Sequence, residues 1–92
     1  ARFFVENMIH FNPRWREELV ASSEEGVLVF ELTMGKYHVY FPGKSKWLES
    51  VPDWAKEKWE LYLEACKVWC GQNNIPISVV DNGLVYEEKG IH

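Results

Sequence analysis

Three side chains suited to acid–base chemistry fall on two predicted neighbouring strands. His38 can accept a proton, Glu31 can orient the imidazole, and Tyr40 can donate a hydrogen bond. In the predicted pairing they share one face of the sheet, where cross-strand and diagonal neighbours lie about 5–8 Å apart. They are the catalytic candidates of a small enzyme. The competing interpretation is a solvated sheet face, since Thr and Tyr favour strands for packing reasons alone.

Other reactive groups lack the partners that their chemistry needs. Cys66 and Cys70 lie one helical turn apart, and no histidine stands near them in the sequence to complete a zinc site. We therefore expect two buried thiols, no metal site and no other cofactor. The run Gly43-Lys44-Ser45 ends like a phosphate-binding loop, but His38 stands where that loop needs a further glycine. Nucleotide binding is not expected there.

Length, composition and charge are those of one small folded unit. The 92 residues are 47% hydrophobic, enough for a single modest core, so residues 1–92 are predicted to form one α+β domain. The formal charge of −4, with only a small spot of lysines beside Trp47, argues against nucleic-acid binding. No apolar run is long enough to span a membrane. The two cysteines make a poor disulfide framework, which favours a cytoplasmic location.

The stretch from Gly26 to Pro42 predicts a β-hairpin around which the other elements are arranged. Apolar residues alternate on both sides of Gly35-Lys36, and a two-residue loop with glycine first suits a type II′ turn with a positive φ at Gly35. That loop sets the register. The predicted pairs are Leu32 with Val39 and Phe30 with Phe41 on the buried face, and Glu31 with Tyr40 and Thr33 with His38 on the other.

Capping residues and periodicity predict the remaining elements. Asn12-Pro13 favours a helix start, so we expect a short first helix over residues 13–24, with a strand over 15–21 as the alternative. Ser50 favours the start and Gly71 the end of a long helix over residues 50–70, after a loop. Strands are predicted over residues 2–11, 75–80 and 84–87, the last two joined by a hairpin turn at Asp81-Asn82-Gly83.

The predicted fold is therefore α+β, an antiparallel sheet with one long helix in the C-terminal half and a short first helix. This order matches a ferredoxin-like βαββαβ arrangement with an added strand. If residues 15–21 form a strand, the alternative is a curled antiparallel sheet over a single helix.

The long predicted helix has an apolar arc that is broader than one sheet face can cover. Uncovered apolar surface of this kind marks interfaces, and two-fold dimers are the commonest oligomers. The first helix or the loop around Trp47 could also cover it. We predict a homodimer through one flank of the arc, formed by Trp54, Leu61, Ala65 and Val68.

These features favour binding over catalysis. Aromatic residues make up 15% of the chain, and interfaces and pockets use them; the predicted ligand-binding residues are Trp47, Trp59 and Tyr40. We expect a small, non-enzymatic, bacterial-type homo-oligomer that binds a small molecule or a protein. One alternative is an immunity-type or inhibitor protein that neutralises a protein partner. The other is a small enzyme that uses His38 and Glu31.

Overall fold

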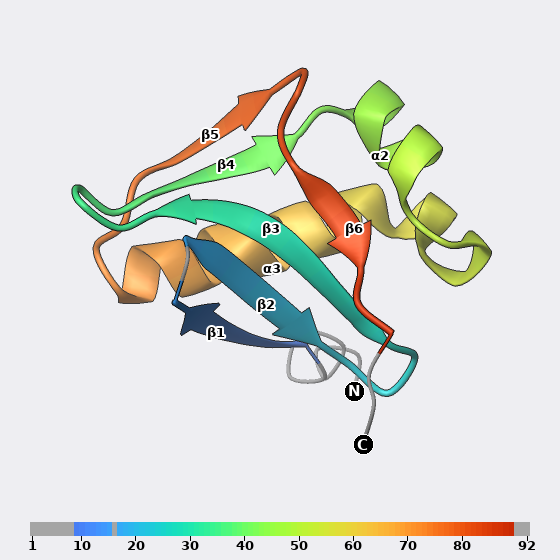
Figure 1. Cartoon of the computed structure of the whole chain (residues 1–92), viewed down its shortest axis with the longest axis horizontal. Coiled ribbons are helices and arrows are strands. Elements are labelled where there is room, and N and C mark those ends of the chain that lie inside the picture. Colours follow the sequence, from blue (N-terminus) through green and yellow to red (C-terminus); the bar gives the residue numbers. More distant parts are fainter. Residues whose placement is uncertain (1–8, 16, 90–92) are drawn as a thin grey trace.

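The computed structural model describes residues 9–15 and 17–89, which form a six-stranded sheet and three helical segments (Figure 1). The strands are β1 (His10–Arg14), β2 (Glu18–Ser22), β3 (Val27–Thr33), β4 (His38–Pro42), β5 (Ile77–Val80) and β6 (Val85–Glu87). The helical segments are α2 (Lys44–Ser50), the 3₁₀ helix η1 (Asp53–Lys58) and α3 (Trp59–Gln72). Of the strand predicted over residues 2–11, residues 2–8 lie outside the described part of the chain.

The sheet is mixed rather than purely antiparallel. β1, β2, β3 and β4 pair in succession as antiparallel neighbours, and β5 adds to β4 in parallel. β6 pairs with the first half of β3, while β4 pairs with its second half. A parallel neighbour needs a crossover connection, which α2, η1 and α3 supply. The α+β class is confirmed, but the order of the elements is not the predicted ferredoxin-like order.

The first helix predicted over residues 13–24 is wrong. The chain turns after β1 and continues as β2, where Leu19 and Ala21 are fully buried and their neighbours are more exposed. Burial of this alternating pair on the sheet outweighs the local helix-start signal of Asn12-Pro13. Pro13 is tolerated because β1 is an edge strand, where a missing N–H need not remove a ladder bond.

The central hairpin of β3 and β4 has the predicted register. Its pairs are Leu32 with Val39, Thr33 with His38 and Glu31 with Tyr40. Phe30 is the exception, because β6 takes the place of β4 along the first half of β3 and sets Val85 opposite it. The ring of Phe30 still stacks on that of Phe41, with centroids 4.9 Å apart.

The turn of this hairpin is not the predicted type II′. No glycine in the described residues has a positive φ, so Gly35 does not use its conformational freedom. Instead the Thr33 hydroxyl donates to the Lys36 carbonyl over 2.8 Å and closes the turn from the side. A side-chain hydrogen bond of this kind replaces the backbone geometry that the loop length suggested.

The long helix predicted over residues 50–70 is confirmed in outline, but it begins after Pro52: η1 and α3 follow each other without a break from Asp53 to Gln72. Proline lacks the N–H that would continue the helix, so α2 ends at Ser50 and the chain restarts as η1 before α3. The loop predicted before Ser50 is the short helix α2. α3 also ends beyond Gly71, at Gln72, and Asn74 follows it with a φ of 57°. The Ile75 N–H bonds to the Cys70 carbonyl over 2.9 Å, which is the Schellman arrangement with Asn in the left-handed position.

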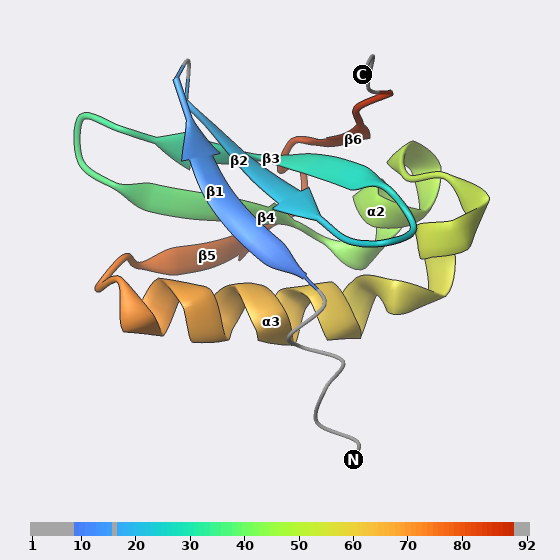
Figure 2. The ribbon, with the colours of Figure 1, turned by 90° about the horizontal axis from the view of Figure 1, so that it is seen from below.

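The core lies between the sheet and α3, which runs along one face of it (Figure 2). Trp47 of α2 closes one end of this core. It is fully buried, its ring lies within 6.2 Å of those of Phe30 and Phe41, and its Nε1 donates to the Ala55 carbonyl over 2.8 Å. The other sheet face carries the polar side chains of β2, β3 and β4.

The turn predicted at Asp81-Asn82-Gly83 forms, but not as a hairpin. The Gly83 N–H bonds to the Val80 carbonyl over 3.1 Å, and the chain then leaves β5 to pair as β6 with β3. Gly83 lies so close to β4 that a Cβ there would be 2.9 Å from the backbone of Phe41 and Pro42. Only glycine allows this approach.

Candidate functional site

An apolar groove of about 490 Å³ lies between β1 and the side of α3. Its apolar walls come from both elements, and exposed polar side chains border them. The lining residues are Ile9, Phe11, Ala65, Val68 and Trp69, with His10, Asn12 and Gln72.

Strand and helix periodicity together build this groove. Alternation along the strand turns Ile9 and Phe11 toward α3, and the helical spacing of Ala65, Val68 and Trp69 puts them on one side of the helix. The rings of Phe11 and Trp69 lie 6.1 Å apart at an interplanar angle of 35°. Val68 is 55% exposed despite its apolar neighbours. Within residues 9–15 and 17–89, no Asp, Glu, Lys or Arg lines the groove, so its described walls suit an uncharged ligand.

A smaller hollow of about 280 Å³ adjoins the groove at Ile9. Leu61 and Tyr62 of α3 form its floor, and the turn between β2 and β3 forms its polar side. There the Lys58 ammonium pairs with the Glu25 carboxylate over 3.2 Å. This hollow extends the apolar surface along α3, and the ion pair of Lys58 and Glu25 lies at one end of it.

The structure brings three of the four predicted interface residues to this side of α3. Ala65 and Val68 line the groove and Leu61 lines the adjoining hollow. Trp54 does not join them. It packs against Gly26 and its Nε1 donates to a Glu87 carboxylate oxygen over 3.3 Å. The reason is that residue 54 lies in the 3₁₀ segment, where the 100° spacing assumed for a continuous α-helix does not hold.

The three predicted ligand-binding residues lie in different places. Trp47 is in the core, and no part of it is exposed. Trp59 is half-buried, and its Nε1 donates to the Pro42 carbonyl over 3.0 Å. Tyr40 lies on the sheet face opposite α3, so the structure does not bring these residues into one pocket.

His38 has a partner that the sequence did not suggest. Its Nε2 lies 2.8 Å from the Ser78 hydroxyl, and its ring stacks on that of Tyr40 with centroids 4.4 Å apart. Glu31 pairs with Tyr40 as predicted but does not line the open hollow of about 530 Å³ beside the imidazole. The missing signal was the parallel pairing of β4 and β5, because only that pairing brings Ser78 beside Tyr40.

Residues of that hollow are mixed in character. β3, β4 and the turn between them supply six of them, and Glu17 and Pro76 come from the segments just before β2 and β5; a single ammonium and a single carboxylate are among them. They are Glu17, Thr33, Gly35, Lys36, Tyr37, His38, Tyr40 and Pro76. His38 and Ser78 are close enough for a proton to pass between them. Neither Ser78 nor Glu31 lines the hollow, however, so the residues of the hollow do not form a complete catalytic set.

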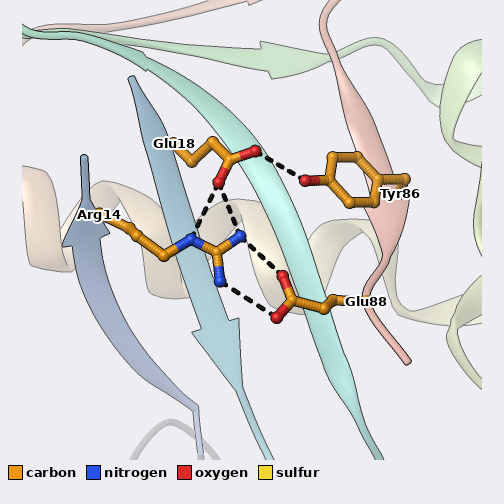
Figure 3. Close-up of polar contacts among 4 residues, drawn as sticks. All are labelled: Arg14, Glu18, Tyr86 and Glu88. Carbon is orange, nitrogen blue, oxygen red and sulfur yellow. Dashed lines mark hydrogen bonds and ion pairs between the residues drawn. The ribbon is translucent and has the colours of Figure 1, made fainter. Parts of the chain in front are cut away.

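Arg14 is held by two carboxylates on the open face of the sheet (Figure 3). Its Nη2 donates to Glu18 and to Glu88, each over 2.6 Å, and the Tyr86 hydroxyl donates to Glu18 over 2.7 Å. These hydrogen bonds raise the pKa of Arg14, and the bond to Glu18 raises the pKa of Tyr86. The cluster ties β1, β2 and the end of β6 together. Arg14 and Glu88 are 74 residues apart, so no local motif predicted it.

Both cysteines are buried on α3, as expected. The hydrogen bond with Cys70 and burial raise the pKa of the Cys66 thiol, which keeps it neutral. Residues 9–15 and 17–89 contain no group of three or more side chains that could hold a metal ion. In the same part of the chain, no helix has the length and apolar character needed to cross a membrane.

The fold and the groove thus define a small α+β protein with a mixed sheet and an apolar surface groove. No protein-family model, curated protein or solved structure matches the chain.

Proposed function

We propose that this chain is a non-enzymatic, homo-oligomeric binding protein whose ligand is a small, uncharged, ring-containing molecule. The binding site is the groove between β1 and α3. The observation that carries the proposal is the exposure of Val68 beside Phe11 and Trp69 in a groove whose described lining residues include no acidic or basic side chain apart from the imidazole of His10. The groove volume of about 490 Å³ falls in the range that holds small ligands. Ala65 and Val68 then contact the ligand.

We also propose the cytoplasm as the location, since two buried thiols suit a reducing compartment.

Binding of N-phenyl-1-naphthylamine, an uncharged fluorescent probe, tests this proposal. We expect one probe per chain and about tenfold weaker binding to Val68→Lys, because loss of one apolar contact of about 1.4 kcal/mol changes affinity tenfold. Leu48→Lys is the matched control, since Leu48 is 43% exposed on α2 and lies outside the groove. Equal weakening by both variants would mean that the probe merely adheres to exposed apolar side chains.

The enzyme alternative has one observation in its favour, the 2.8 Å contact between His38 Nε2 and Ser78 Oγ. A serine bonded to an imidazole can act as a nucleophile. Treatment with a fluorophosphonate reagent tests this directly. Labelling of Ser78 that His38→Ala abolishes would support the enzyme, and an unlabelled Ser78 would exclude this role for it. The inhibitor alternative rests on the acidic net charge alone and stays a prediction.

A further inference from the structure

The two ends of the sheet differ in how well they are protected against pairing with another strand. At β1, Pro13 removes a backbone donor and Arg14 adds a charge, and both are common guards of edge strands. β5 has the sequence ISVV, with neither proline nor a charged residue. Figure 1 draws β5 at the upper margin of the sheet, with no other described element beyond it. An edge of this kind is a template for a further strand.

The pairing of β5 with β4 determines which of its backbone groups point outward. The Val39 N–H bonds to the Pro76 carbonyl over 3.0 Å, and the Gly43 N–H bonds to the Val80 carbonyl over 2.9 Å. The even-numbered residues of β5 therefore bond to β4. Because backbone groups alternate sides along a strand, the N–H and C=O groups of Ile77 and Val79 point away from the sheet. The side chain of Val79 is also 47% exposed.

We propose that two copies of the chain pair antiparallel through β5, about a two-fold axis at Ser78. In this register Ile77 of each copy lies opposite Val79 of the other, and the two pairs exchange four N–H···O=C bonds. All outward backbone groups of Ile77 and Val79 are then used. Ile77 and Val79 pair with Val39 and Phe41 of β4, so their side chains lie on the same sheet face. In this register the exposed Val79 of each copy is therefore covered by the apolar Ile77 of the other.

This inference rests on the proposed homo-oligomer and names its interface. A strand of four residues covers far less than the roughly 1,600 Å² of a standard interface, so we expect a weak dimer that forms only at high concentration. The uncharged edge brings no like charges together across the axis. The axis sets Ser78 of both copies side by side on the open sheet face, each beside its own His38.

Cross-linking of Ser78→Cys tests the register. Residues at a non-hydrogen-bonded antiparallel position have Cα atoms about 4.5 Å apart, within the range that a disulfide spans. The native thiols are buried and should not react. Ser45→Cys on α2 is the matched control, because Ser45 is exposed and lies on another surface. Under mild oxidation we expect Ser78→Cys to cross-link at least about tenfold faster, owing to the high local concentration in the dimer. Equal rates for the two variants would overturn the proposal.

Sedimentation equilibrium separates this inference from the proposed function. We expect the mass of the wild type to rise with concentration, Val79→Lys to stay monomeric, and Val68→Lys to behave as the wild type. If Val79→Lys associates as the wild type does, or Val68→Lys abolishes association, the oligomer stands and the β5 interface is wrong. A wild type that stays monomeric at every concentration refutes the oligomer and this interface together, whereas probe binding in the groove would be unaffected.

Discussion

At the scale of single residues, Arg14 shows how distant segments are held on one sheet. Its guanidinium bonds to Glu18 on β2 and to Glu88 after β6, although β3 lies between those strands (Figure 3). Val29 of β3 lies on the same face as Tyr86 and is fully buried there. We infer that the side chains of this cluster cover Val29, although the alternation along β3 predicts that this face is exposed to solvent.

The Tyr86 hydroxyl gives this cluster a dependence on pH. Because the pKa of Tyr86 is raised in the folded chain, its stabilising contribution is complete below the unfolded value of about 10 and is lost as pH rises through the folded value. We expect Tyr86→Phe to lower the free energy of unfolding by about 1 kcal/mol at pH 7. Urea unfolding between pH 7 and 11 should then show a shallower alkaline loss for the variant. Parallel curves would contradict the role given to this hydroxyl.

At the scale of elements, the sequence was most informative where apolar residues alternate on both sides of a short turn, even though the turn type itself was predicted wrongly. The register of β3 and β4 follows from the alternation around Leu32 and Val39 and was predicted correctly. The prediction of a first helix was wrong because burial of Leu19 and Ala21 on the sheet stabilises the chain more than a helix beginning at Asn12-Pro13 would.

The candidate site was predictable only on its helical side. Helical spacing singled out Ala65 and Val68, but as dimer-interface residues and not as part of a ligand groove, whereas Ile9 and Phe11 join them through the placement of β1 beside α3. Pairings between distant strands leave no local pattern, so neither the groove nor the contact of His38 with Ser78 could be read from spacing.

Gly83, packed against β4, and Gly71, inside α3, form a matched pair of positions at which an alanine substitution should have opposite effects on stability. A Cβ at Gly83 would lie 2.9 Å from the backbone of β4, which cannot move aside, so we expect Gly83→Ala to lower the free energy of unfolding by about 2 kcal/mol or more. Gly71 lies inside α3 and has open space around it. Gly71→Ala should therefore raise that free energy by about 0.5–1 kcal/mol. Thermal and urea unfolding of both variants measure this difference, and the same sign for both would contradict the assignments.

At the scale of the whole molecule, the two sides of the sheet have different roles. α3 runs along one face of the sheet (Figure 2), and the core lies between them. The groove lies between β1 and the side of α3. The opposite edge, at β5, carries the outward backbone groups proposed to pair with a second copy. The proposed ligand and the proposed second copy would thus occupy separate ends of the sheet, so we expect a substitution that removes one to leave the other bound.

The most direct test of the central claim is an amide NMR titration of the wild-type chain with N-phenyl-1-naphthylamine. We expect saturable shifts confined to the amides of Phe11, Ala65, Val68 and Trp69 and their neighbours, because these residues line the groove. Shifts centred instead on Lys36, Tyr37 and His38, or none at the groove, would contradict it.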